Sequence, residues 1–542
     1  LKLPKASRAA PGGKMTHPRR GPHRRPLLRA IATALQVGLP LAQQIDRAQP
    51  ENDVTNRVVH YAVDGVRHRA GVMLDAGWRW LNRNGQTCQA TEGKASLESC
   101  SLKGLDDAAY RKGYGIHVGA PSGSSLTLRF AAIDSYAWQP NYGSRVYLTD
   151  MDTRGGAGYV LFKPMGGEIS FTVDLSRVPA GMNAAVYLVS MDKLGNLNAS
   201  YGNGERNGAG WKRGLGYCDA QCPRNLKFVQ GAGWNDGQLM SCCPEMDLFE
   251  ANRLAAAFTA HPCASDRRSV HTCTPTEGDC GASSYCDTAG ADMNTFRRFG
   301  PSQALYEVID PHEPFKVRTR FATDGTGSLE LIEQIFEQGS TSFSANITDE
   351  SMAAQKALFG EENDFARIGG LAQMGKALER GMVMALALWS DPGGNMNWLD
   401  SCLSDAYDCA GSSPASPKVF EDAPPGTWRG PVDAFPDMAS SFASETVELS
   451  YPGIPEDWRS QAPFECSQAG GRWDCSSVEY QLVVSDISVL SRPPEPTEPP
   501  VRPAPAPAPA APTPAIPSPA SGWRPWWLLW TCGLGLFFAS QG

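Results

Sequence analysis

Residues 241–252 read Ser-Cys-Cys-Pro-Glu-Met-Asp-Leu-Phe-Glu-Ala-Asn, with three acidic side chains set among apolar ones. Residues two apart on a β-strand share a face, so Glu245 and Asp247 point to one side while the apolar residues between them point into the packing. Glu250 is out of phase by one residue. A β-bulge inserts one extra residue into a strand and would return Glu250 to the face of the other two. The run therefore predicts a strand that carries three carboxylates along one groove.

Two other structures could use three carboxylates at this spacing, namely an acidic helix face and a calcium site. The surrounding residues favour the strand. Cys242 and Cys243 stand at its entry, and His261 follows in the run Thr-Ala-His-Pro-Cys. Cysteines around such a run are typical of a site that is held rigidly in place.

The composition of the whole chain favours short strands joined by turns. Charged residues make up 20% of the sequence, which also contains 55 Gly and 42 Pro. Such a composition argues against long charged helices. Alternating or β-branched runs predict strands over 124–133, 168–175, 184–191, 315–322, 382–389 and 478–490. Helical patterns are few, the best of them at 350–358 and 368–379, so we predict an all-β fold built as a sandwich.

The two ends of the chain differ in composition from its middle. A basic segment followed by an apolar one predicts a signal peptide, and Pro alternating with Ala predicts an extended polyproline II spacer. We divide the sequence into an upstream extension at 1–14, a signal peptide at 15–48, a β-sandwich domain at 49–491, a Pro/Ala-rich linker at 492–522 and a hydrophobic, Trp-rich tail at 523–542.

The tail has more than one interpretation. Its apolar run at 526–539 is shorter than the roughly 20 residues that a membrane-spanning helix needs. Small residues before it resemble a glycolipid-anchor signal, although the spacer is shorter than the roughly 8 to 12 residues expected. Attachment to a membrane or a cell wall through this tail stays open.

The cysteines indicate an oxidising compartment. Fourteen of the fifteen lie in the β-sandwich segment, and paired thiols would not persist in a reducing cytosol. A zinc site is the alternative, because Cys218 and Cys222 have ligand-like spacing, but the adjacent cysteines at 242–243 suit two neighbouring disulfides better. Glycosylation sequons at Asn198 and Asn346 also fit a secreted chain.

The charge balance excludes one class of partner. The net charge is -8, and no basic run follows residue 30. A nucleic-acid binder needs a basic footprint that this sequence lacks. We therefore expect no nucleic-acid partner.

The acidic residues fit the chemistry of glycoside cleavage. That reaction needs one ionised carboxylate to attack the anomeric carbon and one neutral carboxyl group to protonate the leaving oxygen. Retention of configuration places the two groups about 5 to 5.5 Å apart, where like-charge repulsion raises the pKa of one partner. Glu245 and Glu250 on a bulged strand agree with both requirements.

Four motifs carry a family resemblance. They are Asp-Ala-Gly-Trp-Arg-Trp at 75–80, Gly-Tyr-Cys-Asp-Ala-Gln-Cys-Pro at 216–223, Cys-Cys-x-Glu-Met-Asp-x-x-Glu-Ala-Asn at 242–252 and the stretch 389–401. Through them the sequence resembles glycoside hydrolase family 7, the cellobiohydrolases and endoglucanases best known from fungi. The resemblance implies a concanavalin-like jelly-roll sandwich of two curved antiparallel sheets, with long loops over a substrate groove. It also implies hydrolysis of β-1,4-linked glucan such as cellulose.

Roles for the acidic residues follow from the same resemblance. It implies that Glu245 is the nucleophile, Glu250 the acid/base, Asp247 the residue that orients the nucleophile, and His261 a neighbour of the acid/base. The reaction is then a retaining one that uses no metal and no organic cofactor. The resemblance further implies two adjacent disulfides among Cys218, Cys222, Cys242 and Cys243, and the pairs Cys263–Cys286 and Cys273–Cys280.

Aromatic and polar residues are candidates for substrate contact. A flat indole covers the apolar face of a sugar ring, although core packing is the alternative for tryptophans in a sandwich. Trp78 and Trp80 share a strand face by their spacing, and an ion pair is the alternative for Arg145. The resemblance implies sugar platforms at Trp78, Trp80, Trp389 and Trp398, and polar contacts from Arg145, Asn183, Tyr187, Asp219, Gln221 and Arg429.

The mode of attack depends on loop length. The connection between Cys222 and Cys242 is short and resembles that of endoglucanases with an open cleft, so we favour internal cleavage over cellobiose release from chain ends. A noncatalytic glucan-binding lectin is the alternative from another class, because a fold does not by itself imply turnover. A transglycosylase would use the same carboxylate pair. We expect a monomer without an obligate protein partner.

Overall fold

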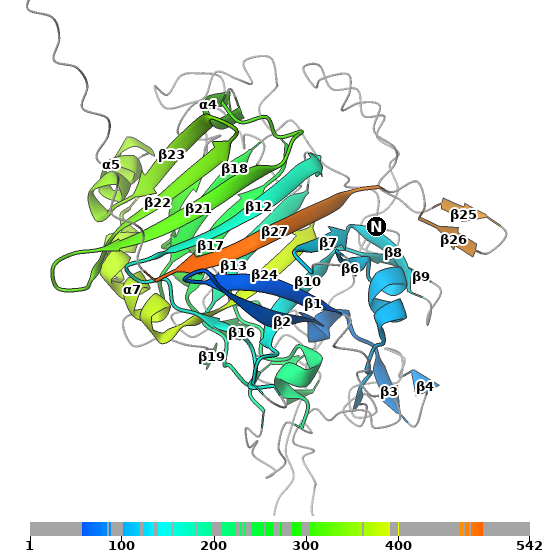
Figure 1. Ribbon diagram of the computed structural model, residues 1–542. Coiled ribbons are helices and arrows are strands. Elements are labelled where there is room, and N and C mark those ends of the chain that lie inside the picture. The colour runs from blue at the N-terminus through cyan, green and yellow to red at the C-terminus, as the bar shows by residue number, and fades with distance from the viewer. Residues whose placement is uncertain are drawn as a thin grey trace, which may run out of the picture. The chain divides into compact units, whose positions relative to one another are not determined.

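Strands dominate the computed structural model (Figure 1). It describes residues 57–83, 86–87, 101–119, 123–134, 139–153, 156–179, 182–197, 208–223, 228–229, 232–233, 240–253, 255–263, 271–273, 285–294, 303–306, 308–359, 362–390, 399, 467–469, 472–475 and 479–491.

The largest sheet follows the path β20-β18-β17-β13-β24-β10-β2-β1-β27-β12-β21-β22-β23 and forms two layers. The first layer comprises β20 (Ala291–Asn294), β18 (Ala256–His261), β17 (Glu245–Ala251), β13 (Asn183–Val189), β24 (Met382–Trp389), β11 (Leu161–Phe162), β10 (Ser144–Asp150), β2 (Val66–Leu74) and β1 (Val58–Val63). The second comprises β27 (Gln481–Leu490), β12 (Glu168–Arg177), β21 (Phe315–Thr323), β22 (Leu329–Gln338), β23 (Thr341–Ile347), β7 (Ser125–Arg129) and β6 (Ile116–Val118).

Neighbouring strands within each layer run antiparallel. The exception lies between the layers, where β1 pairs in parallel with β27 through Ala62 and Val63. This short parallel pairing joins the two layers into one hydrogen-bonded path. Two separate antiparallel sheets were expected, so the connection is a feature that the sequence pattern did not indicate.

Shorter elements surround the two layers. The remaining strands are β3 (Leu81–Arg83), β4 (Gln86–Thr87), β5 (Ser101–Leu102), β8 (Ala131–Asp134), β9 (Gln139–Tyr142), β14 (Phe228–Val229), β15 (Ala232–Gly233), β16 (Met240–Cys242), β19 (His271–Cys273), β25 (Ser467–Ala469) and β26 (Arg472–Asp474). The α-helices are α2 (Tyr285–Thr288), α4 (Gln303–Tyr306), α5 (Asp349–Phe359), α6 (Asp364–Arg367) and α7 (Gly370–Arg380). Single helical turns of other types span Ala76–Trp78, Ala109–Gly113 and Gly210–Arg213.

The core lies between the two layers and is rich in aromatic rings. Phe249 of β17 is fully buried. Its ring centroid lies 6.2 Å from that of Phe171 on β12, 6.0 Å from that of Phe315 on β21 and 6.4 Å from that of Phe336 on β22. Edge-to-face and tilted packing at these distances is favourable for aromatic pairs. One residue of β17 therefore binds the layer that carries the acidic residues to three strands of the other layer.

The predicted all-β sandwich is confirmed, and most predicted strands lie within one or two residues of observed ones. The run 124–133 differs, because it divides into β7 and β8. The Phe130 amide donates to the Tyr480 carbonyl at the break, after which β8 leaves the large sheet and pairs with β9. The two predicted helices correspond to α5 and α7, and α6 is a short helix that was not predicted.

The predicted terminal segments at 1–14, 15–48, 492–522 and 523–542 lie outside the described residues, so their boundaries stay predictions. Within the described part of the chain, every helix is too short or too polar to cross a membrane.

We predict that Phe249→Ala lowers the free energy of unfolding by about 3 to 5 kcal/mol, the usual cost of truncating a buried aromatic ring. Urea unfolding followed by tryptophan fluorescence measures the change. The control is Val66→Ala, because Val66 is 59% exposed and its truncation should alter stability by less than about 0.5 kcal/mol. Equal effects of the two substitutions would contradict the described packing.

Candidate active site

A β-bulge in β17 brings the acidic side chains together. The pairing partner on β18 moves by two residues, from Thr259 to Ala257, while β17 advances by three, from Asp247 to Glu250. A matching register shift appears on the β13 side. The extra residue returns Glu250 to the side of Glu245 and Asp247, and the three carboxyl groups interact electrostatically. The predicted bulge is confirmed and the helix alternative is wrong; we call this side of the sheet the carboxylate face.

One row of the carboxylate face crosses four strands. Glu250 on β17 pairs with Ala185 on β13, Ala185 pairs with Ala387 on β24, and Ala387 pairs with Arg145 on β10. Because paired residues in antiparallel strands point to the same side, two short alanines separate the carboxyl group from the guanidinium group. The backbone register thus fixes where the charged ends of this row stand.

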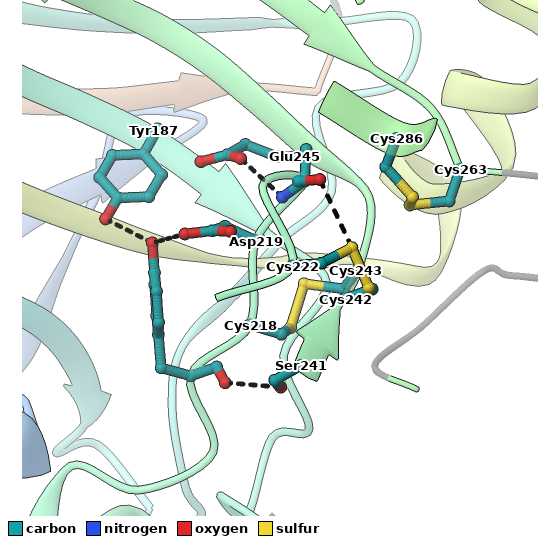
Figure 2. The surroundings of a disulfide bond; sticks show 12 residues. Tyr187, Cys218, Asp219, Cys222, Ser241, Cys242, Cys243, Glu245, Cys263 and Cys286 are labelled. Atoms are coloured by element: carbon teal, nitrogen blue, oxygen red, sulfur yellow. Dashed lines mark hydrogen bonds between the residues drawn. A yellow bond between two sulfur atoms is a disulfide. The ribbon is translucent and has the colours of Figure 1, made fainter. Parts of the chain in front are cut away.

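Glu245 is held by a backbone amide. Its side chain is 8% exposed, and its Oε2 accepts a 2.8 Å hydrogen bond from the Ala220 N–H (Figure 2). Ala220 lies between Cys218 and Cys222, both of which are cross-linked. A carboxylate that accepts such a bond keeps one fixed orientation, which suits a group that must attack a single carbon atom.

Disulfides fix the segments around Glu245 (Figure 2). The bonds join Cys218 to Cys243, Cys222 to Cys242 and Cys263 to Cys286. These pairings agree with those that the family resemblance implies. The proposed partner of Cys273, Cys280, lies outside the described residues.

Asp219 is the fourth acidic residue of the site. The Tyr217 hydroxyl donates to its Oδ2 at 2.6 Å and lies 3.1 Å from the Tyr187 hydroxyl (Figure 2). The Gln221 side chain is exposed. Burial raises the pKa of Asp219 to about 6, and the Tyr217 bond opposes that rise. Asp219 Oδ1 has no hydrogen-bond partner among the described residues.

Asp247 contacts the predicted histidine. His261 Nε2 lies 3.3 Å from Asp247 Oδ2, and His261 Nδ1 lies 3.1 Å from the Asp287 carbonyl oxygen. A carbonyl can only accept, so Nδ1 carries a proton and donates it. The contact between Nε2 and Asp247 then requires one more proton, on either the ring or the carboxyl group.

Glu250 has a buried amide as its partner. The Asn183 Nδ2 donates to Glu250 Oε1 at 2.7 Å, and Asn183 is fully buried at the start of β13. Burial raises the pKa of Glu250 to about 7, although the Asn183 bond favours the ionised form. Trp389 pairs with Asn183 across β24 and β13. The sequence-predicted residues Asn183, Trp389 and Glu250 therefore meet at one point of the carboxylate face.

Burial raises the pKa values of Glu245 and Asp247 well above their usual range. The Asp247 charge raises that of Glu245 further, while His261 and the Ala220 amide oppose the rise. Four carboxyl groups enclosed together cannot all ionise, so protons are held among them near neutral pH.

No cluster of three or more His, Cys, Asp or Glu side chains in the described ranges is arranged to hold a metal ion. The cysteines of the zinc alternative, Cys218 and Cys222, are both in disulfides. The calcium and zinc alternatives therefore find no ligand set in this part of the chain.

Arg145 is an ion-pair partner that lies between aromatic rings. Its Nε and Nη2 both lie 3.2 Å from Asp75 Oδ2, so the ion-pair alternative is correct. Its Cζ stands 3.2 Å from the centroid of the Tyr217 ring and 5.5 Å from that of Trp78. Stacking and pairing together fix the guanidinium group beside the carboxylate face.

The predicted shared strand face of Trp78 and Trp80 is wrong. Trp78 ends the helical turn Ala76–Trp78, and Trp80 lies between that turn and β3. The turn forms because the Asp75 side chain accepts a hydrogen bond from the Gly77 amide, which competes with an extended backbone. Both tryptophans are partly buried.

Of the four remaining candidate residues, the structure describes one. Trp398, Arg429 and Asn198 lie outside the described residues. Asn346 lies exposed on β23, the last strand of the sheet path, and its glycosylation stays a prediction.

Three residues of the site were not among the candidates. Asp75 and Tyr217 lie inside motifs that carry the family resemblance, and a polar residue next to a matched tryptophan or cysteine was the available signal. Asp287 follows Cys286 and interacts electrostatically with Asp219 and Asp247. Its sequence context gave no signal, because Asp287 lies on α2, which the Cys263–Cys286 disulfide ties to the end of β18.

We predict that the Glu250 carboxyl group titrates near pH 7 and that Asn183→Ala raises this midpoint, because the lost amide favoured the ionised form. Carboxyl-selective ¹³C NMR of glutamate-labelled protein measures both values, with Glu250→Gln identifying the resonance. Asn363→Ala is the control, because its side chain caps α6. A midpoint that falls in Asn183→Ala would contradict the described bond.

Comparisons with known proteins agree with this geometry. The model of glycosyl hydrolase family 7 matches residues 63–417. Exoglucanase GH7B of Limnoria quadripunctata is 32% identical over 468 residues, which cover 78% of this chain and 97% of the relative. A GH7 family cellobiohydrolase from Daphnia pulex aligns with a TM-score of 0.59 at 25% identity, covering 83% of this chain and 97% of that one. A cellobiohydrolase from Melanocarpus albomyces complexed with cellotetraose aligns with a TM-score of 0.58 at 27% identity, covering 82% and 98%.

Both the fold and the family predicted from the motifs are thereby confirmed, including the jelly-roll sandwich. The family match spans β2 through β24 and includes all four acidic residues of the site, namely Asp219 and the three on β17. The chain belongs to glycosyl hydrolase family 7 and is a glycoside hydrolase.

Proposed function

We propose that this protein hydrolyses β-1,4-glucosidic bonds of cellulose or a related β-glucan with retention of configuration. Glu245 is the nucleophile and Glu250 is the acid/base. The observation that carries the proposal is the bulge in β17, which places both glutamates on one face. The curated relative named as an exoglucanase supports the substrate class.

The environment of Glu250 suits the acid role that the reaction requires. Glu250, with its pKa raised to about 7, keeps a proton at acidic pH and can give it to the leaving glycosidic oxygen. Glu245 attacks the anomeric carbon as that bond breaks and forms a glycosyl-enzyme ester. Glu250, now ionised, then takes a proton from water, and the resulting hydroxide equivalent displaces Glu245 from the sugar.

Asp247 orients Glu245 and shares a proton with it. The two side chains share a hydrogen bond, and burial raises both pKa values, so the pair holds one proton. A proton on Asp247 can be donated to Glu245, which leaves the nucleophile negative. The Ala220 amide adds a second donor to the same carboxylate at 2.8 Å. His261 limits the movement of Asp247 from the other side.

Aromatic residues beside the carboxyl groups form the sugar-binding surface. Trp389 pairs with Asn183, and Asn183 bonds to Glu250. Trp389 is therefore close to the carboxyl group that protonates the leaving oxygen. The centroid of the Trp78 ring lies 5.5 Å from Arg145 Cζ. We assign both rings to sugar stacking, with Trp80, Trp398 and Arg429 as further contacts.

Internal cleavage is the mode of attack that we favour. The short connection between Cys222 and Cys242 supports an open cleft. Chain-end attack is the second candidate, because the relatives from Limnoria quadripunctata and Daphnia pulex are named exoglucanase and cellobiohydrolase.

Secretion is part of the proposal. The three disulfides of the described residues need an oxidising compartment. We propose an extracellular monomer that acts on polysaccharide.

We predict that Glu245→Gln reduces turnover by at least about a thousandfold, as expected for loss of a covalent nucleophile. Oligosaccharide binding should persist, because the amide has nearly the same shape. Turnover is measured as reducing ends released, and binding by calorimetry. Near-normal turnover would exclude Glu245 as nucleophile, and binding without turnover in the wild-type chain would favour a lectin.

Glu250→Gln is the matched companion variant. The loss of turnover in this variant should be larger on cellulose than on an activated aryl cellobioside, whose leaving group needs little protonation. Equal losses on both substrates would contradict an acid role for Glu250.

We predict that soluble carboxymethyl cellulose loses viscosity steeply for each reducing end formed. A cut within the chain halves its length, whereas a cut at the end removes one small product. Viscometry with parallel reducing-end assays measures the ratio. Cellobiose release with little change of viscosity would instead support attack from chain ends.

A further inference from the structure

The bulge in β17 leaves Leu248 out of the pairing register of both neighbouring strands. Leu248 appears in the register of neither β13 nor β18, between which β17 lies. Leu248 is fully buried in the apolar core. A buried carbonyl needs a hydrogen bond, because it has given up water. Some group from outside the two neighbouring strands must therefore satisfy it.

That group comes from the opposite layer. The Gln334 Nε2 of β22 donates to the Leu248 carbonyl oxygen and, at 3.2 Å, to Thr319 Oγ1 of β21. Gln334 and Thr319 are both fully buried. On β22, Gln334 interrupts an inward row whose other members, Ile332 and Phe336, are apolar core residues.

An amide in such a row is costly unless it makes hydrogen bonds. An apolar residue would fill this position of the sandwich without that cost. The amide therefore has a specific use, and the atom that it contacts lies between Asp247 and Glu250.

We propose that Gln334 is a positioning residue that holds the bulge of β17 and thereby sets the position of Glu250 relative to Glu245. This inference rests on the proposed retaining mechanism. Glu245 is fixed on its own side by the Ala220 amide, so a shift at Leu248 changes the position of Glu250 relative to Glu245. The two carboxyl groups must stand about 5 to 5.5 Å apart for retention, and a misplacement of about 1 Å is enough to slow catalysis strongly.

The test is Gln334→Leu, compared with wild type on two aryl cellobiosides with good and poor leaving groups. We expect a loss of kcat of about ten- to hundredfold on the poor leaving group, a smaller loss on the good one, and a KM within about twofold. Ile332→Val is the matched control, because it disturbs the same inward row and leaves the amide in place. It should keep the wild-type ratio between the two substrates.

Rescue distinguishes positioning from general destabilisation. In Gln334→Glu the buried acid stays protonated at acidic pH, so its O–H can donate to the Leu248 carbonyl. We expect activity close to wild type at low pH that falls as this acid ionises. If Gln334→Leu does not fold, Thr319→Val replaces it, because it removes the second partner of the amide at nearly equal volume.

The experiment distinguishes a failure of the proposed function from a failure of the role proposed for Gln334. A wild-type chain that releases no reducing ends from either substrate would overturn the proposed function. An active wild type with a substrate ratio unchanged in Gln334→Leu, or in Thr319→Val where that variant is used, would overturn the role of Gln334 alone.

Discussion

In an antiparallel strand that covers an apolar core, side chains alternate between two faces, so acids at positions 245, 247 and 250 cannot all face one way. The strand must gain one residue between the second and third acid. In β17 the extra residue is accommodated at Leu248 and Phe249, whose side chains are both fully buried in the core. The ring of Phe249 contacts rings on β12, β21 and β22, and these contacts offset the energetic cost of the bulge. Core packing and the carboxylate pair therefore depend on the same bulge.

The second constraint is the burial of like charges. Asp219, Glu245, Asp247 and Glu250 lie close enough to raise one another's pKa values, and burial raises them further. Such a cluster is stable only if it holds protons, and its neighbours decide where these protons reside. The Ala220 amide and the Asn183 amide each favour the ionised form of one glutamate. Glu245 has a further side-chain partner in Asp247, so the two chemically equal residues stand in different surroundings.

Covalent and ionic links keep the loops in register with the strands. The disulfides at Cys218 and Cys222 hold the segment whose amide contacts Glu245. On the other side, the ion pair of Arg145 with Asp75 ties β10 to the turn that carries Trp78. Rigid placement of this kind is what a reaction with tolerances well below an ångström needs.

Much of this could be predicted from the sequence. Alternation of apolar residues gave the strands, and the spacing of Glu245, Asp247 and Glu250 required a bulge if they were to act together. The four motifs were specific enough to indicate the family. The turn at Asp75 was missed, because a side chain that caps its own backbone overrides the alternating pattern that suggested a strand.

By itself, the sequence determined the all-β class and the family, and it indicated which acidic residues lie together on β17, because these depend on local periodicity and on motif spacing. Tertiary structure alone decided which groups bind each acid. Gln334 lies 86 residues from Leu248 along the chain, and Asn183 lies 67 residues from Glu250. Such contacts arise only when two layers close over a common core, and no local pattern encodes which side chains then meet.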